Sequence, residues 1–281
     1  MKCIYPSLSN LDLGFFRLGG AGLANCMYVA ARAYSYSLRY NAELIEPTWE
    51  KISIGPILRG EQDKRHYIGL FDKPFMHGLK KLKQIYKKMI AESEIETFVS
   101  STDGVLKVSG LGNYFQDLNQ KESAEYFNLI IKEHIKEIID SENFDNVVAV
   151  HVRLGDYSSS QRTPIMWYRD MIKIVSDYNP DLKFYVFSDG SDEELESIIE
   201  LPHVERKFFG NALADILAIS RCKLVLASDS TFSAWGAFLG NVPIIFPKRH
   251  FPPVYKNNSV MELVSENTEL TAELSELLST L

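Results

Sequence analysis

The chain has 281 residues, of which 46% are hydrophobic and 24% are charged, and its formal net charge at pH 7 is −7. This is ordinary globular usage, which excludes disordered, collagen-like and coiled-coil proteins, and the acidity argues against a broad nucleic-acid-binding surface. No stretch approaches the roughly 20 apolar residues that cross a bilayer, and residues 1–10 lack the apolar centre of a signal peptide.

The first half of the chain has two clear helical patterns. Small and aromatic side chains fill residues 25–39, which predicts a buried helix. Residues 49–112 show no regular period apart from a basic stripe at 79–88, which fits either a solvated helix face or attraction to an anionic membrane surface. Apolar residues recur with a 3.6-residue period over 123–139, which predicts one continuous amphipathic helix.

From residue 146 onward, short apolar strands alternate with helices. This alternation predicts a doubly wound parallel sheet covered by helices on both faces. We expect an N-terminal domain over residues 1–143 and a C-terminal domain over 144–281, with a last helix that could return to the first domain. The expected strands are 146–152, 183–188, 204–208, 223–228 and 242–247, and the expected helices are 165–178, 192–200, 211–221 and one from 231.

Polar residues end the first two of these strands, where doubly wound sheets bind their ligands. The first strand leads into His151, Arg153 and Asp156, and the second ends in Ser188 and Asp189. Arg153 can offer two parallel N–H donors to a phosphate, while Asp156 can orient it or accept a proton. The structural alternatives are a capping salt bridge between Arg153 and Asp156 and a plain turn role for Asp189.

Two further loops could bind an anion or approach a ligand through their own backbone. The strand at 223–228 is followed by a hydroxyl-rich loop that opens a helix, where free N–H groups and the positive dipole end favour an anion, unless the loop is only a helix cap. A glycine loop with Gly20 and Gly22 precedes Asn25, although Asn25 stands where a dinucleotide fingerprint requires glycine or alanine. The polar strand ends together predict a nucleotide-phosphate site.

Several of these segments resemble glycosyltransferase family 11, the α-1,2-fucosyltransferases. H-V-R-L-G-D-Y at 151–157 resembles the family motif H-x-R-x-G-D-Y, and residues 215–223 with 230–235 resemble its D-L-x-x-M-S-x-C-K and N-S-T-F-S-W-W block. Residues 54–67 and 184–190 are similar to two further family segments. The chain departs from the family at Ala24 and Cys26 in the glycine motif, at Asp229 where the family has asparagine, and at Ala234 where it has tryptophan.

The resemblance implies a GT-B-like fold, with two Rossmann-like domains facing a cleft. The donor substrate GDP-fucose would lie in the C-terminal domain and the glycan acceptor would face the N-terminal domain. Arg153 would hold the β-phosphate, with Arg153 and Asp156 as the catalytic candidates. The other implied donor contacts are His151, Ser188, Asp189, Asp215, Ser230, Thr231 and Phe232, together with Gly22 and Asn25.

The implied reaction is inverting transfer of L-fucose from GDP-β-L-fucose to O2 of a galactoside, in α-1,2 linkage. No D-x-D triplet occurs at a predicted strand end, so we expect no metal and no cofactor. An aspartate such as Asp215 can accept hydrogen bonds from guanine N1–H and N2–H₂, and it alternatively caps the helix at 211–221. No residue stands out as the base on the acceptor hydroxyl, although Asp156 is a candidate.

Two other functions remain open from the residues alone. An NAD(P)-dependent oxidoreductase would use the Gly20 loop but would leave the 151–157 motif unexplained. A non-catalytic GDP-sugar-binding homologue would account for Ala24, Cys26 and Ala234. The three cysteines lack C-x-x-C spacing, which fits a reduced, cytoplasmic setting. The family implies polysaccharide biosynthesis at the inner face of the membrane, with peripheral contact to lipid-linked glycan.

Overall fold

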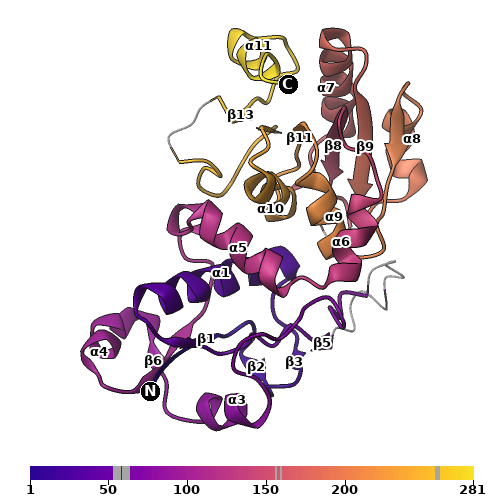
Figure 1. Ribbon diagram of the computed structural model, residues 1–281. Coiled ribbons are helices and arrows are strands. Elements are labelled where there is room, and N and C mark those ends of the chain that lie inside the picture. Colours follow the sequence, from indigo (N-terminus) through magenta and orange to yellow (C-terminus); the bar gives the residue numbers. More distant parts are fainter. Residues whose placement is uncertain (53–57, 59–63, 156, 159, 257–259) are drawn as a thin grey trace. The chain divides into compact units, whose positions relative to one another are not determined.

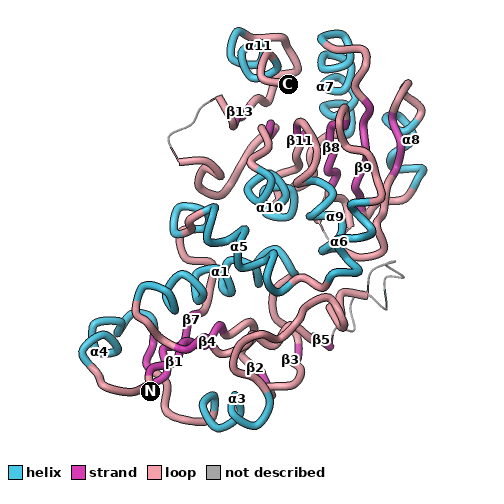
Figure 2. The backbone as a smooth tube through the Cα atoms, in the orientation of Figure 1, coloured by secondary structure: helices cyan, strands magenta, loops and turns pink. Residues whose placement is uncertain are grey.

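The computed structural model describes residues 1–52, 58, 64–155, 157–158, 160–256 and 260–281. The chain divides into two compact units, Met1–Lys136 and Glu137–Leu281, and each is described by itself. Helices and strands alternate in both units (Figure 2), so both belong to the α/β class. In the described ranges, no helix has the length and apolar character needed to span a bilayer.

The first unit is built on a parallel sheet with strand order β4-β1-β7-β6. Helix α1 packs on this sheet, and α5 packs on α1 (Figure 1). A smaller sheet has the order β2-β3-β5. The strands are β1 (Lys2–Pro6), β2 (Leu11–Asp12), β3 (Arg17–Leu18), β4 (Glu43–Leu44), β5 (Lys51–Ile52), β6 (Ile90–Ala91) and β7 (Gly104–Val108), and the helices are α1 (Leu23–Arg39), α3 (Gly78–Ile85), α4 (Ile95–Ser100), α5 (Gln120–Ile130) and α6 (Glu133–Asp140), which crosses the division.

The helix predicted at 25–39 is confirmed as α1, but residues 49–112 are more regular than predicted. They contain β7, which pairs in parallel with β1 along its whole length. This strand was missed because it has only five residues and Lys107 interrupts its apolar run. A short strand of this kind gains its stability from the neighbouring strand, which the sequence period does not show.

The single helix predicted over 123–139 is wrong, because the chain leaves the helical conformation at Ile131. The backbone of Ile131 is extended, with φ −74° and ψ 127°, and it forms a bridge with Phe71. The Asp72 N–H donates to the Ile130 carbonyl at 2.7 Å, and the Lys132 N–H donates to the Leu70 carbonyl at 3.2 Å. Tertiary pairing thus replaces the helical hydrogen bonds and separates α5 from α6.

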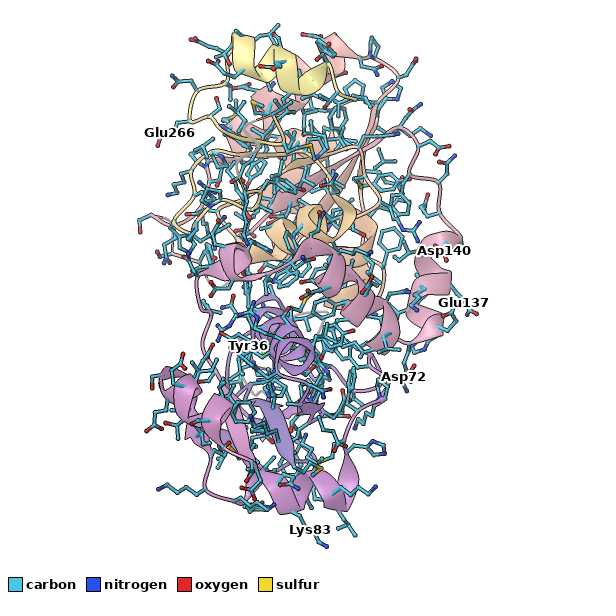
Figure 3. The ribbon with its side chains drawn as sticks, turned by 60° about the vertical axis from the view of Figure 1, so that its left-hand side comes forward. Tyr36, Asp72, Lys83, Glu137, Asp140 and Glu266 are labelled. Atoms are coloured by element: carbon cyan, nitrogen blue, oxygen red, sulfur yellow. The ribbon has the colours of Figure 1, made fainter. Side chains whose placement is uncertain are left out.

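Helix α3 carries the basic stripe predicted at 79–88. Lys83 lies on its outer surface (Figure 3) and is exposed, as are Lys87 and Lys88 beyond the helix. Lys81 differs, because only 3% of it is exposed and its Nζ donates to Thr48 Oγ1 at 2.7 Å. The stripe therefore combines one buried structural lysine with exposed lysines, which fit either of the two predicted roles.

The second unit is a six-stranded parallel sheet with order β10-β9-β8-β11-β12-β13, in which β8 and β9 lie side by side (Figure 1). Counted from β8, this is the order 3-2-1-4-5-6 of a Rossmann fold. The strands are β8 (Val147–Val152), β9 (Lys183–Ser188), β10 (Val204–Arg206), β11 (Leu224–Leu226), β12 (Ile244–Phe246) and β13 (Glu262–Val264), and the helices are α7 (Ile165–Tyr178), α8 (Asp192–Ile199), α9 (Ala212–Ile219), α10 (Thr231–Gly240) and α11 (Ala272–Leu278). The predicted doubly wound sheet is confirmed.

Alternation along β8 explains how helices cover both faces of this sheet. Val148, Val150 and Val152 are packed in one apolar core with side chains of α7, α8 and α11. The residues between them point to the opposite face, where His151 meets α10. Strand β8 is buried along its whole length, as a central strand of a parallel sheet requires.

Two segments near the domain limits pack with the second unit. Asp140 forms an ion pair with Arg221 at 2.8 Å, and Glu142 accepts a 2.9 Å hydrogen bond from the Tyr185 hydroxyl. The division therefore falls before residue 137, seven residues ahead of the predicted start at 144. Leu274, Leu277 and Leu278 of α11 lie in the apolar core of the second unit.

Candidate functional site

The strand order fixes where a ligand site is expected in the second unit. Chain order reverses between β8 and β11, the two central strands, and Rossmann folds bind their ligands at the carboxyl ends of such a pair. Strand β8 ends at Val152 and is followed by Arg153. Strand β11 ends at Leu226, and the loop after it contains Ser228, Asp229 and Ser230. Two of the predicted polar strand ends therefore meet at this switch point.

His151 is held at the switch point by two hydroxyl groups. Its Nδ1 lies 2.9 Å from Ser228 Oγ and 3.1 Å from Ser233 Oγ, and its ring stacks on Phe232 with centroids 4.9 Å apart. Burial, followed by the nearby charge of Arg153, lowers the pKa of His151 to about 3. The ring is therefore neutral at physiological pH and serves as a positioned hydrogen-bonding group.

Arg153 is joined to Asp189 by a salt bridge that links the ends of β8 and β9. Asp189 Oδ1 also accepts the N–H groups of Leu154 at 2.9 Å and Gly155 at 3.1 Å. Burial alone would raise the pKa of Asp189, but Arg153 and these two N–H groups lower it below its usual value. The carboxylate is thus ionised and holds the guanidinium in place.

Gly155 allows this arrangement. A Cβ atom at Gly155 would overlap the Asp189 carboxylate, so only glycine lets the turn approach the aspartate closely. Ser188 closes the turn after β9, because its Oγ accepts the Gly190 N–H at 3.0 Å. Ser188 and Asp189 therefore both have definite structural partners at this edge.

Helix α10 begins beside His151. Ser230 is its N-cap and accepts the Phe232 N–H at 3.2 Å, and Thr231 is the first helical residue. Ser233 then reaches back to His151 from the first turn. The predicted anion cradle and the predicted His151 site are thus one continuous structure.

Asp215 lies in α9, but it is not the cap of that helix. The cap is Asn211, whose side chain accepts the Ala214 N–H at 2.9 Å. Asp215 Oδ1 instead accepts the Phe209 N–H at 2.8 Å, which fixes the loop before α9. Asp215 is 8% exposed, and its predicted contact with guanine stays a prediction.

Gly22 and Asn25 lie in the first unit, at the start of α1. Gly22 is the N-cap, with φ −67° and no capping side chain. The loop before it is held by two buried cations, because Arg17 Nη1 donates to the Gly19 carbonyl at 2.8 Å and Lys51 Nζ donates to the Gly20 carbonyl at 3.1 Å. Two carbonyl groups of the glycine loop therefore accept hydrogen bonds from buried side chains.

Some predicted features fall outside this description, and others were missed. Asp156 and most of the 54–67 segment lie outside the described residues. Ser233 and His250 were not predicted from the sequence. The signal used for the other strands, a polar residue shortly after the end of a strand, would have identified His250 after β12. Among the residues that the structure describes, no group of three or more His, Cys, Asp or Glu side chains is arranged to hold a metal ion.

Comparison with known proteins identifies the family of this chain. The family model "Glycosyl transferase family 11" matches residues 71–245. An α-1,2-colitosyltransferase of Escherichia coli is 25% identical over 252 residues, which is 80% of this chain and 87% of that protein. The O-antigen biosynthesis glycosyltransferase WbnK of Escherichia coli is 24% identical over 177 residues, which is 54% of this chain and 58% of WbnK's length.

Among solved structures, the fold is similar to that of the fucosyltransferase NodZ from Bradyrhizobium. The TM-score is 0.54 at 14% identity, with 86% of this chain and 94% of NodZ covered. NodZ, an α-1,6-fucosyltransferase, has also been crystallised with GDP. The predicted GT-B-like fold with two Rossmann-like domains is confirmed.

Proposed function

Because the chain belongs to glycosyltransferase family 11, we propose that it transfers L-fucose from GDP-β-L-fucose to a hydroxyl group of a glycan. The observation that carries the proposal is the grouping of His151, Arg153 and the start of α10 at the switch point of a Rossmann sheet. A neutral hydrogen-bonding ring, a fixed cation and a helix N-terminus are suited to a nucleoside diphosphate.

The chemistry of transfer explains why these groups are useful together. When the bond between the sugar C1 and the β-phosphate oxygen breaks, negative charge grows on the phosphate. Arg153, held in place by Asp189, and the first N–H groups of α10 would stabilise that charge, and one such donor is worth about 3 kcal/mol. Asp215 would accept the N1–H and N2–H₂ groups of guanine and so select it over adenine.

We propose α-1,2 linkage to a galactoside, with inversion at C1, because the donor is β-linked and an α-1,2 product is an α-glycoside. The name of the colitosyltransferase supports the linkage and adds a second candidate sugar. Colitose is L-fucose without its 3-hydroxyl, so the same site could take either. The O-antigen relative supports a role in polysaccharide biosynthesis, with a lipid-linked acceptor at the inner face of the membrane.

Calorimetry and turnover test this proposal directly. GDP should bind with micromolar affinity in the presence of EDTA, while UDP, ADP and NADH bind at least about 10-fold more weakly. Binding of NADH in preference to GDP would instead favour an oxidoreductase. Incubation with GDP-fucose or GDP-colitose and a panel of galactosides should yield an α-1,2-linked product, and NMR of that product identifies the linkage. GDP binding without any turnover would favour the non-catalytic homologue.

Metal dependence gives a separate test. We expect transfer to continue after treatment with EDTA, because Arg153 and the α10 N-terminus supply the positive charge that a metal would otherwise bring. Activity lost in EDTA and restored by magnesium or manganese would contradict this part of the proposal.

A further inference from the structure

A second histidine, His250, lies at the same edge of the C-terminal sheet as the proposed donor site. It follows the end of β12, and Asp229 follows the end of the neighbouring β11. Asp229 Oδ1 accepts the backbone N–H of His250 at 3.1 Å and lies 2.6 Å from His250 Nδ1. One carboxylate oxygen therefore joins the loops that follow two adjacent parallel strands.

These contacts determine which nitrogen of His250 carries the proton. An ionised carboxylate only accepts hydrogen bonds, so the Nδ1 atom that faces Asp229 is protonated. In the neutral ring the other nitrogen, Nε2, then has a lone pair that can take a proton. In the part of the chain that the structure describes, no residue forms a hydrogen bond with Nε2.

The two side chains differ in exposure. A group that orients another is expected to be buried, and a group that reacts with a substrate is expected to be accessible. The side chain of Asp229 is 12% exposed and that of His250 is 58% exposed. Because His250 also donates its backbone N–H to Asp229, the carboxylate is anchored as well as paired. The neighbouring Arg249 is paired with Glu262, so it does not compete for Asp229.

The position of Asp229 connects this pair to the proposed donor site. Ser228, which precedes it, is hydrogen-bonded to His151, and Ser230, which follows it, caps α10. Consecutive Cα atoms are about 3.8 Å apart, so Asp229 lies between two residues of the site. The family motif has asparagine here, and an amide has no charge with which to stabilise a protonated ring.

We propose that His250 is the general base of the transfer reaction and that Asp229 is its positioning residue, an inference that rests on the proposed function. His250 Nε2 takes the proton of the acceptor hydroxyl while that oxygen forms a bond to C1 of the sugar. The bond from C1 to the β-phosphate oxygen breaks, and GDP leaves with its electron pair. Asp229 stabilises the resulting imidazolium, which then releases its proton to water.

The test compares wild type with His250→Ala, Asp229→Asn and the control His134→Ala, which removes an exposed histidine from α6. Melting temperature and GDP affinity are measured for each, followed by transfer from GDP-fucose with and without added imidazole. We expect His250→Ala to bind GDP within about 3-fold of wild type and to lose about 10²- to 10⁴-fold in kcat. Added imidazole should raise the kcat of His250→Ala at least about 10-fold, because it replaces the missing base. Asp229→Asn should lose less kcat than His250→Ala, because its amide oxygen can still accept a hydrogen bond from His250 Nδ1.

Four outcomes would overturn the assignment. His250→Ala could retain near wild-type turnover. Alternatively, its kcat could stay low in the presence of imidazole while its melting temperature and GDP affinity fall in parallel, which would mean that the pair only connects the two loops structurally. Asp156→Asn could abolish transfer while His250→Ala does not. Wild-type protein that binds GDP but turns over no donor would overturn the proposed function, and this inference with it.

Discussion

At the scale of single residues, most polar groups of the site are held by other groups of the same site. Arg153 is positioned by Asp189, and His151 by Ser228 and Ser233. Such bracing keeps donors in place before the ligand arrives, which is the condition for effective electrostatic stabilisation. It also means that substitutions at these residues will act through geometry as well as through charge.

Replacing Arg153 with alanine should lower kcat/KM for GDP-fucose by at least about 10²-fold, the size of one lost transition-state donor. Arg221→Ala is the matched control, because Arg221 forms a surface pair with Asp140 and its side chain is 58% exposed. The control should leave kcat/KM unchanged, since exposed pairs contribute little. A folded Arg153→Ala enzyme with near wild-type turnover would show that the salt bridge with Asp189 is purely structural.

Asp215→Asn should weaken GDP binding about 10- to 100-fold and reduce the preference for GDP over ADP. The amide can accept only one of the two guanine donors, and unpaired buried groups cost about 1–3 kcal/mol. Asn211→Ala is the control, because it removes the cap of the same helix. It should lower the free energy of unfolding by about 1 kcal/mol and leave the GDP-to-ADP ratio alone. If Asp215→Asn also lowers the free energy of unfolding without changing the GDP-to-ADP affinity ratio, the role of Asp215 is structural.

At the scale of elements, the position of α10 depends on its close packing against α9. A Cβ atom at Gly236 would overlap Ile219, and one at Gly240 would overlap the backbone of Ser220. Both glycines therefore allow the two helices to approach closely. Because Ser230 and Phe232 begin the same helix, its packing also positions the predicted phosphate-binding turn.

Gly240→Ala should destabilise the protein by about 1–3 kcal/mol, the usual cost of overpacking against an atom that cannot move aside. Gly236→Ala should cost less, because its closest neighbour is the side chain of Ile219 and not backbone. GDP affinity should fall with Gly240→Ala as α10 is displaced. Urea unfolding and GDP calorimetry measure both effects, and equal stability of the two variants would contradict the packing argument.

At the scale of the whole molecule, the first unit contains a buried carboxyl group that makes its stability depend on pH. Glu46 is 1% exposed and accepts the Phe75 N–H at 3.3 Å. Burial raises the pKa of Glu46 from 4.5 to about 7, although the amide and the nearby Lys81 oppose the shift. Burial also lowers the pKa of Lys81 to about 8.

The sign of this effect follows from proton binding. Between about pH 4.5 and 7 the folded chain holds the Glu46 proton and the unfolded chain does not, so Glu46 lowers stability as pH rises through this range. Glu46→Gln should remove that decline and be more stable than wild type at pH 8, by on the order of 1–3 kcal/mol. Urea unfolding from pH 4.5 to 8 checks this, with the exposed Glu125→Gln as control. A wild-type curve parallel to that of Glu46→Gln would refute it.

Local pattern by itself determined the first five strands of the second unit and the sheet edge at which its polar residues lie, but β13 was not predicted. β-Branched runs separated by helices specified the parallel sheet, because a strand buried on both faces needs apolar side chains throughout. Since parallel strands all end at one edge, His151, Arg153, Ser188, Asp189 and the Ser230 loop could be placed there without coordinates. The capping box of Ser191 and Glu194 was also readable, because its partners lie three residues apart.

Only the tertiary structure decided the pairings between distant residues. Ile131 ends α5 because Phe71 pairs with it, and Asp189 meets Arg153 because β9 lies beside β8. Asp229 meets His250 for the same reason, since β11 and β12 are neighbours. Each contact depends on the order of the strands in the sheet and on which distant segments the core brings together. The spacing of apolar residues within one segment carries no information about these two properties.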